Sequence, residues 1–248
     1  ARDTLSDLLT FFDDSPLRPR AFIEQSQVLE ALGERERAIK TAQRATLEYP
    51  DNPDVLRNNG ELQGLDGNPL AAAVAFVAAD KAGAADPSLL LNAARYYRTA
   101  NMPTEATRTY QRLKTHYAGT PEALSGSIEA AKLRYEQGGT EGALDDLKAL
   151  LAATQGTRHQ LPTLEAIQSI YRNLGLTDHI KTTAREIVAE ATEPETLAQA
   201  AMDLMNSNDL ENAQAAIEKL DFNRLRTRTA FSLLMKEGEA LLSIAPQR

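Results

Sequence analysis

Small and apolar side chains recur along the first half of the chain at the spacing of a buried helical stripe. Alanine occupies three positions that are 34 residues apart, and further small or apolar residues follow each of these alanines four and seven positions later. This i, i+4, i+7 pattern is typical of helices that bury one face. The three stripes are Ala38, Ala42 and Ala45; Ala72, Phe76 and Ala79; and Ala106, Tyr110 and Leu113.

Prolines keep the same interval. Pro19, Pro53, Pro87 and Pro121 follow one another at intervals of 34 residues, and proline is well placed in the first turn of a helix. Between each of the first three prolines and the following alanine stripe lies a short segment that is typical of helix ends and turns. The pattern therefore predicts successive helix–turn–helix units. The turn segments are Leu32-Gly33-Glu34, Asp66-Gly67-Asn68 and Asn101-Met102-Pro103.

The 34-residue helix–turn–helix pattern resembles the tetratricopeptide repeat (TPR). The clearest match is Asn59-Gly60 followed by Ala72 and Phe76. The tryptophan of the repeat signature is absent, and Phe22, Leu56 and Leu90 stand in its place. The resemblance implies an all-α fold, a right-handed α-solenoid of about six TPR helix–turn–helix units with partial units at both ends.

The repeat phase slips after the third unit. Pro121 and Leu161 are separated by 40 residues rather than 34, so that six residues are inserted between them. We therefore expect five segments along the chain. These are residues 1–18, helix B of a preceding partial repeat; 19–153, TPR units 1–4; 154–160, an insertion or hinge; 161–221, TPR units 5–6; and 222–248, helix A of a truncated following repeat.

Composition excludes several kinds of chemistry. The chain has a formal net charge of −8 and no clustered basic stripe, which argues against nucleic acid as a partner. It has no cysteine, which excludes disulfides and thiolate sites, and no apolar run long enough for membrane insertion. His116, His159 and His179 share no metal-ligand spacing, and no phosphate-binding loop is present. We therefore expect neither an enzyme nor a cofactor.

The remaining candidate site is the inner face of the first helix of each unit, which the resemblance places in a concave groove. Asparagine occurs at the sixth position of two successive units, Asn58 and Asn92, and its amide can hold an extended peptide backbone. An ordinary polar groove face is the alternative. The predicted partner-binding residues are Arg57, Asn58, Glu61, Asn92, Arg95 and Arg98.

TPR proteins that bind the acidic C-termini of chaperones use a five-residue carboxylate clamp, and this chain departs from it. The clamp contains two lysines, two asparagines and an arginine, of which only Asn58 is matched. Chaperone-tail binding of that kind is therefore not expected. The five corresponding positions carry Ile23, Gln27, Asn58, Ser88 and Asn92.

Two settings remain open for a scaffold of this type. The acidic charge, the absence of cysteine and the alanine-rich divergent repeats are similar to the periplasmic arrays of bacterial exopolysaccharide-export proteins of the cellulose, Pel or alginate type. That resemblance implies a periplasmic protein partner and a weak contact with polysaccharide. The alternative is a cytoplasmic adaptor or regulatory array within a larger multidomain protein.

Overall fold

The computed structural model describes residues 2–12 and 14–244. The outermost residues of the two predicted partial repeats, residue 1 and residues 245–248, lie outside the described residues. The described part contains fourteen α-helices, one short 3₁₀ helix and no strand. The helices are α1 (Arg2–Phe11), α2 (Arg18–Ala31), α3 (Arg35–Glu48), α4 (Pro53–Leu65), α5 (Pro69–Lys81), α6 (Pro87–Thr99), α7 (Pro103–His116), α8 (Pro121–Glu136), α9 (Thr140–Ala153), α10 (Gln160–Leu174), α11 (Thr177–Glu190), α12 (Pro194–Asn206), α13 (Leu210–Glu218), η1 (Phe222–Arg224) and α14 (Thr227–Ile244).

The periodic prolines open helices, as the sequence predicts. Pro53 begins α4 and Pro87 begins α6. The residue before each of these two prolines caps the helix. Its side-chain oxygen accepts hydrogen bonds from backbone N–H groups that have no partner within the helix. The Asn52 side chain accepts from the backbone N–H groups of Asp54 and Val55, at 3.1 Å each, and Asp86 accepts from that of Ser88 at 2.9 Å.

The alanine stripes lie where the two helices of one helix–turn–helix repeat cross. Ala38, Ala72 and Ala106 are completely buried. A methyl group at each crossing lets the second helix approach the first closely, and the larger side chains of the stripe fill the space on either side. Phe76 of α5, for example, packs with Leu56 of α4 in one core cluster. The predicted all-α fold of stacked helix pairs is confirmed.

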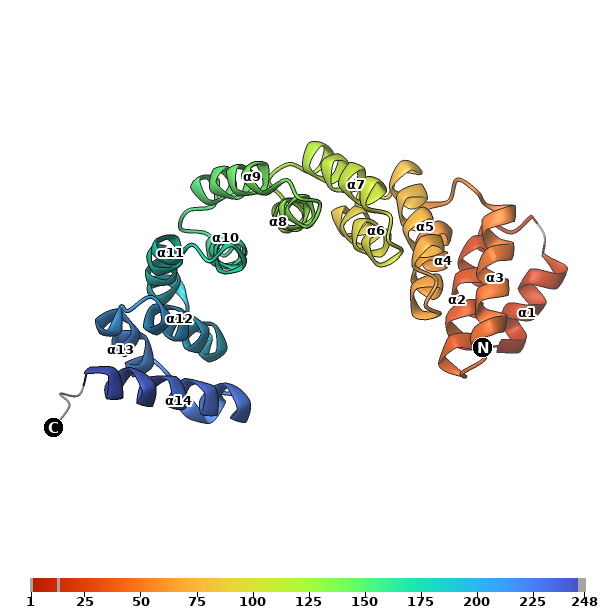
Figure 1. The fold of residues 1–248 in the computed structure, drawn as a ribbon. Helices are drawn as coiled ribbons and strands as arrows, with labels where there is room; N and C mark the ends of the chain where they lie inside the picture. Colours follow the sequence, from red (N-terminus) through yellow and green to blue (C-terminus); the bar gives the residue numbers. More distant parts are fainter. Residues whose placement is uncertain (1, 13, 245–248) are drawn as a thin grey trace. The chain divides into compact units, whose positions relative to one another are not determined.

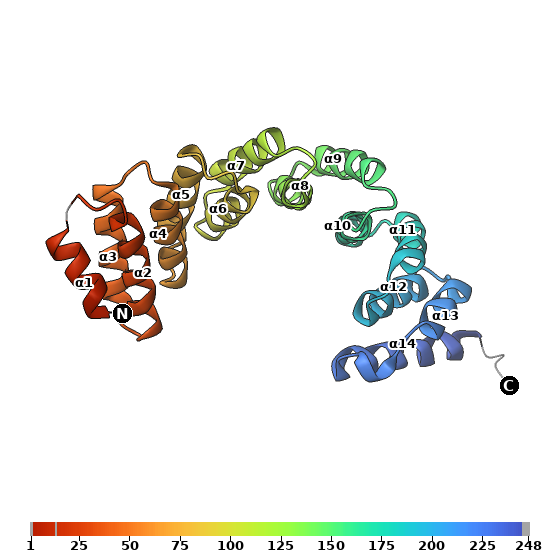
Figure 2. The ribbon, with the colours of Figure 1, turned by 180° about the vertical axis from the view of Figure 1, so that it is seen from behind.

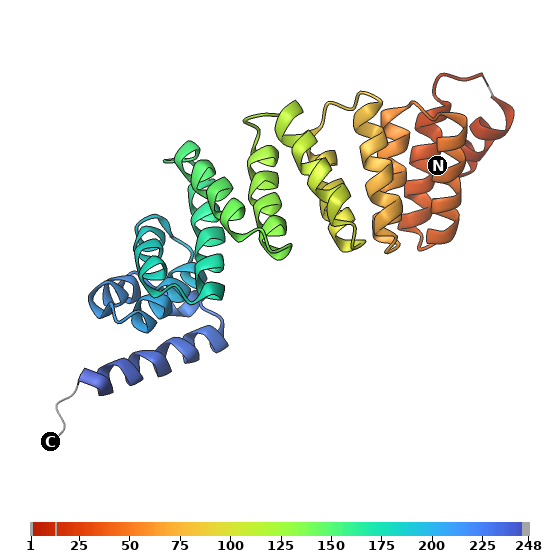
Figure 3. The same ribbon diagram turned by 45° about the horizontal axis from the view of Figure 1, so that its top comes forward.

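The chain forms two compact units, residues 1–133 and 134–248. In the first unit the pairs α2–α3, α4–α5 and α6–α7 follow one another in chain order (Figures 1 and 2), and α2 also contacts α4 directly. We call α2, α4 and α6 the A helices of this unit and α3, α5 and α7 its B helices. Figure 3 shows neighbouring helices of this unit side by side.

The second unit contains the pairs α10–α11 and α12–α13, and α14 packs against α12. The boundary between the units falls in the last turn of α8. The predicted insertion at residues 154–160 lies within the second unit, where residues 154–159 connect α9 to α10 and Gln160 begins α10. Its role as a hinge remains a prediction.

Candidate partner-binding surface

The A helices of the first unit enclose a hollow of about 530 Å³ between α2 and α4. Three of the six residues that the sequence nominates, Arg57, Asn58 and Glu61, line it. Their spacing on α4 brings them to one face, because residues three and four apart are neighbours on a helix surface. The remaining lining residues are Pro16, Pro19, Arg20, Ile23, Gln27, Asn52 and Asp54.

Arg57 interacts with two carboxylates, one on its own helix and one from the next repeat. Its guanidinium donates to Asp54 on the same helix and lies 3.9 Å from Asp86, the cap of α6. These contacts offset part of the positive charge beside the hollow. Arg57 therefore shapes the wall of the hollow more than it offers an unpaired cation to a ligand.

Asn58 belongs to the buried floor of the hollow. Only 5% of its surface is exposed, and its Nδ2 donates a hydrogen bond of 2.8 Å to Ser26 Oγ of α2. Ser26 Oγ in turn donates to the Ile23 carbonyl at 2.8 Å. Asn58 thus connects two successive A helices, and this contact uses one of the two donor sites of its amide group.

Glu61 brings an unpaired carboxylate to the same hollow. Burial raises its pKa above the usual value, and the Arg57 guanidinium opposes this effect. No hydrogen bond or ion pair joins Glu61 to another residue of the described chain. Glu61 is nevertheless exposed, and its carboxylate can accept a charge-assisted hydrogen bond from a cationic ligand group.

The three predicted residues of α6 differ in their contacts. Asn92 is half-buried, and its amide has no hydrogen-bond partner among the described residues. Arg95 forms an ion pair of 2.6 Å with Glu129 of α8. Arg98 interacts with the hydroxyl of Tyr110, which also donates to Glu129 at 2.7 Å.

These contacts divide the six predicted residues into two groups. The three arginines and Asn58 are engaged within the protein, whereas Glu61 and Asn92 have polar groups that remain available. Sequence reasoning placed all six on one face, but the pairing partners Asp86, Glu129 and Ser26 come from neighbouring repeats. No spacing within a single helix could have revealed those partners.

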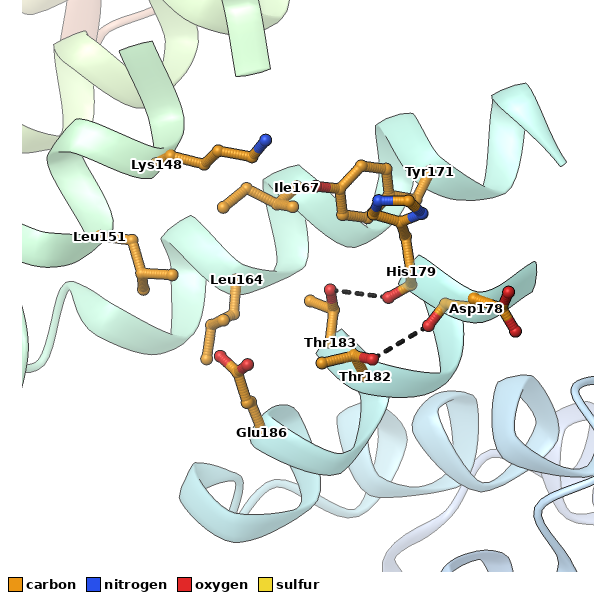
Figure 4. A pocket seen from close by; sticks show the side chains of 10 residues that line it. All are labelled: Lys148, Leu151, Leu164, Ile167, Tyr171, Asp178, His179, Thr182, Thr183 and Glu186. Carbon is orange, nitrogen blue, oxygen red and sulfur yellow. Dashed lines mark hydrogen bonds between the residues drawn. The ribbon is translucent and has the colours of Figure 1, made fainter. Parts of the chain in front are cut away.

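A second concave site, which the sequence did not indicate, lies in the second unit and has a volume of about 320 Å³. Figure 4 shows Leu151 of α9 and Leu164 and Ile167 of α10 on its apolar side. Lys148 and Glu186 lie at different edges of this recess. The site combines side chains from three helices, which explains why no local sequence pattern predicts it.

Both threonine hydroxyls of this recess are engaged by the backbone of their own helix. The Thr182 and Thr183 hydroxyls donate to the backbone carbonyls of Asp178 and His179, at 3.0 and 2.9 Å (Figure 4). The His179 ring packs on Tyr171 with 4.8 Å between ring centroids. A hydroxyl that donates to its own helix is not activated as a nucleophile. The apolar side of the recess is suited to an apolar group.

Two further features bear on function. Within residues 2–12 and 14–244, no group of three or more histidine, aspartate or glutamate side chains is arranged to hold a metal ion. None of the helices in this part of the chain is both long and apolar enough to cross a membrane.

Comparison with known proteins identifies the fold. No protein-family model and no curated protein matches the chain, but many solved structures do. The type IV pilus biogenesis factor PilW aligns with a TM-score of 0.58 and 13% identity, over 89% of this chain and 100% of PilW. PilF of Pseudomonas aeruginosa aligns with a TM-score of 0.56 and 11% identity, over 95% and 99%. A TPR protein of Parabacteroides merdae aligns with a TM-score of 0.55 and 14% identity, over 95% of this chain and 90% of that protein.

These similarities show that the chain has the TPR solenoid fold. At such low identities they show the fold alone, and the functions of the matched proteins do not transfer with it.

Proposed function

We propose that this chain is a non-catalytic TPR scaffold that binds an extended segment of a protein partner in the hollow between α2 and α4. The observation that carries the proposal is the hollow itself, together with the unpaired Glu61 carboxylate within it. TPR solenoids expose continuous surfaces of this kind, which suit protein binding. Asn92, on the next A helix, adds an amide that can hold a peptide backbone.

The setting that we propose is the bacterial periplasm, as a segment of an exopolysaccharide secretion component of the cellulose type. Its support is the similarity in charge, cysteine content and repeat divergence described above. In this setting the chain would also make a weak direct contact with the polysaccharide. The alternative is a cytoplasmic TPR adaptor, which shares the fold and the hollow but has a partner in a different compartment.

Photo-crosslinking in the source cell tests the proposal. A photoreactive amino acid replaces Gln27, which lines the hollow, or Gln214, which is exposed on α13 of the second unit. We expect position 27 to capture a discrete protein that position 214 does not, and the compartment of that protein distinguishes the two settings. The same products from both positions, or none from position 27, would contradict partner binding in the hollow.

A further inference from the structure

The recess of the second unit lies at the point where the repeat spacing changes. It is lined by α9, α10 and α11, and residues 154–159 form the connection between α9 and α10. At this connection α9 packs on α10 less extensively than α5 packs on α6 in the first unit. The inserted residues and the looser helix contact thus coincide with the recess.

The floor of the recess is apolar. Leu164 and Ile167 of α10 are only 1% and 3% exposed, and Leu151 of α9 is half-buried beside them. Figure 4 shows no polar side chain of the lining between Leu151 and Leu164. A polar ligand group on this floor would lose its hydration without gaining a hydrogen bond, which is costly. The floor therefore accepts an apolar group.

Two other polar side chains of the lining are not directed at this floor. The His179 ring packs against Tyr171, and Figure 4 shows the Asp178 carboxylate pointing away from Leu164. The charged groups that a ligand on the floor can reach are therefore those of Lys148 and Glu186.

Lys148 and Glu186 carry opposite charges on opposite walls. Lys148 lies three residues before Leu151 on α9, so that the two share one face of that helix, whereas Glu186 belongs to α11. Figure 4 shows Leu164 and Ile167 between the two charged side chains. Both charged side chains are exposed, and no hydrogen bond or ion pair joins either of them to another described residue. The two charges are therefore available to a ligand that spans the floor.

We propose that this recess binds a segment of a protein partner in which a large aliphatic residue lies between an acidic and a basic residue. The aliphatic side chain occupies the floor, the acidic residue pairs with Lys148, and the basic residue pairs with Glu186. Pairs of this kind form charge-assisted hydrogen bonds, and opposite charges on the two walls select against segments of a single charge. The site lies in the second unit and does not depend on the hollow between α2 and α4.

The volume of the recess agrees with this occupant. Pockets for small molecules have volumes of roughly 300–1,000 Å³, and the recess, at about 320 Å³, is at the lower end of that range. It therefore has room for one large side chain and the groups beside it.

The test uses three fluorescein-labelled peptides with a central leucine. The leucine is flanked by glutamate on one side and lysine on the other, by glutamate on both sides, or by lysine on both sides. By fluorescence anisotropy at low salt, the full chain should bind the mixed peptide about tenfold more tightly than either of the others. A mixed peptide with glycine in place of leucine should not bind.

Single charge reversals locate the site. Lys148→Glu leaves two acidic walls and should transfer the preference to the peptide with lysine on both sides. Glu186→Lys leaves two basic walls and should transfer it to the peptide with glutamate on both sides. These expectations hold whichever direction the peptide takes across the recess. The matched controls are Lys81→Glu on α5 and Glu218→Lys on α13, which are exposed, lie outside the recess and change the net charge equally; both should bind as the wild type does.

Four results would overturn the proposal. They are equal affinity of the wild type for the three peptides, no binding of any peptide, an unchanged preference in Lys148→Glu or Glu186→Lys, and a changed preference in the controls. Titration calorimetry with decanoate addresses a small amphiphile as the occupant. Decanoate binding that Lys148→Glu abolishes, without peptide binding, would assign the recess to an amphiphile instead.

Discussion

Asn58 and Asn92 show how far a repeat register constrains a single residue. Both asparagines occupy the sixth position of an A helix, 34 residues apart. Asn58 is buried and donates to Ser26, whereas Asn92 is half-buried and has no partner among the described residues. The difference arises from the preceding helix, because the small hydroxyl of Ser26 is in reach of Asn58.

The first prediction separates these two roles. Asn58→Ala should lower the free energy of unfolding by about 1–3 kcal/mol, because it removes the buried hydrogen bond that Ser26 Oγ accepts. Asn92→Ala removes the same amide from a site without a hydrogen bond and should cost less than about 0.5 kcal/mol. Urea unfolding followed by circular dichroism measures both values.

A double-mutant cycle with Ser26→Ala checks that the contact is the cause. The Ser26 and Asn58 substitutions should be non-additive by about 1 kcal/mol, since each removes the same interaction. Equal costs for Asn58→Ala and Asn92→Ala, or simple additivity with Ser26→Ala, would show that the hydrogen bond does not stabilise the fold.

At the scale of the helices, much of the architecture could be predicted from the sequence, because the signals are local. A proline with a preceding asparagine or aspartate marks the start of α4 and of α6, and the alanine at each crossing marks the core. The hydrogen bond from Asn58 to Ser26 could not be inferred in the same way, because it joins two successive A helices.

The helix crossing provides the second prediction. Ala72→Leu should destabilise the protein by about 1–3 kcal/mol. Ala72 is completely buried where α5 meets α4, and leucine would add three carbon atoms to this packed contact. The matched control is Ala71→Leu, one residue earlier on the exposed side of the same helix, which should change stability by less than about 0.5 kcal/mol. Thermal and urea unfolding of the two variants test the register, and a Ala72→Leu protein as stable as the wild type would contradict it.

At the scale of the whole chain, the sequence predicts the succession of helix–turn–helix repeats but not the boundary between the two compact units. The spacing from Pro121 to Leu161 directs attention to the insertion at 154–160, whereas the boundary between the two compact units falls at residues 133 and 134. A change in repeat length is visible in the sequence. The density of contacts between successive helices depends on side chains from several repeats, so it cannot be read from the sequence.

A repeat array is stabilised mainly by contacts between neighbouring units, so that damage to one part should remain local. Leu204 of α12 is completely buried in the core of the second unit, and Leu204→Ala should cost about 2–5 kcal/mol by creating a cavity. Hydrogen exchange measured by mass spectrometry should then show faster exchange in α11, α12 and α13 and unchanged exchange in α4, α5 and α6. Leu90 of α6 is equally buried in the first unit, so Leu90→Ala is the reciprocal control and should give the opposite pattern. If either substitution accelerated exchange equally in both units, the chain would unfold as one cooperative body, and stability would not be local to each unit.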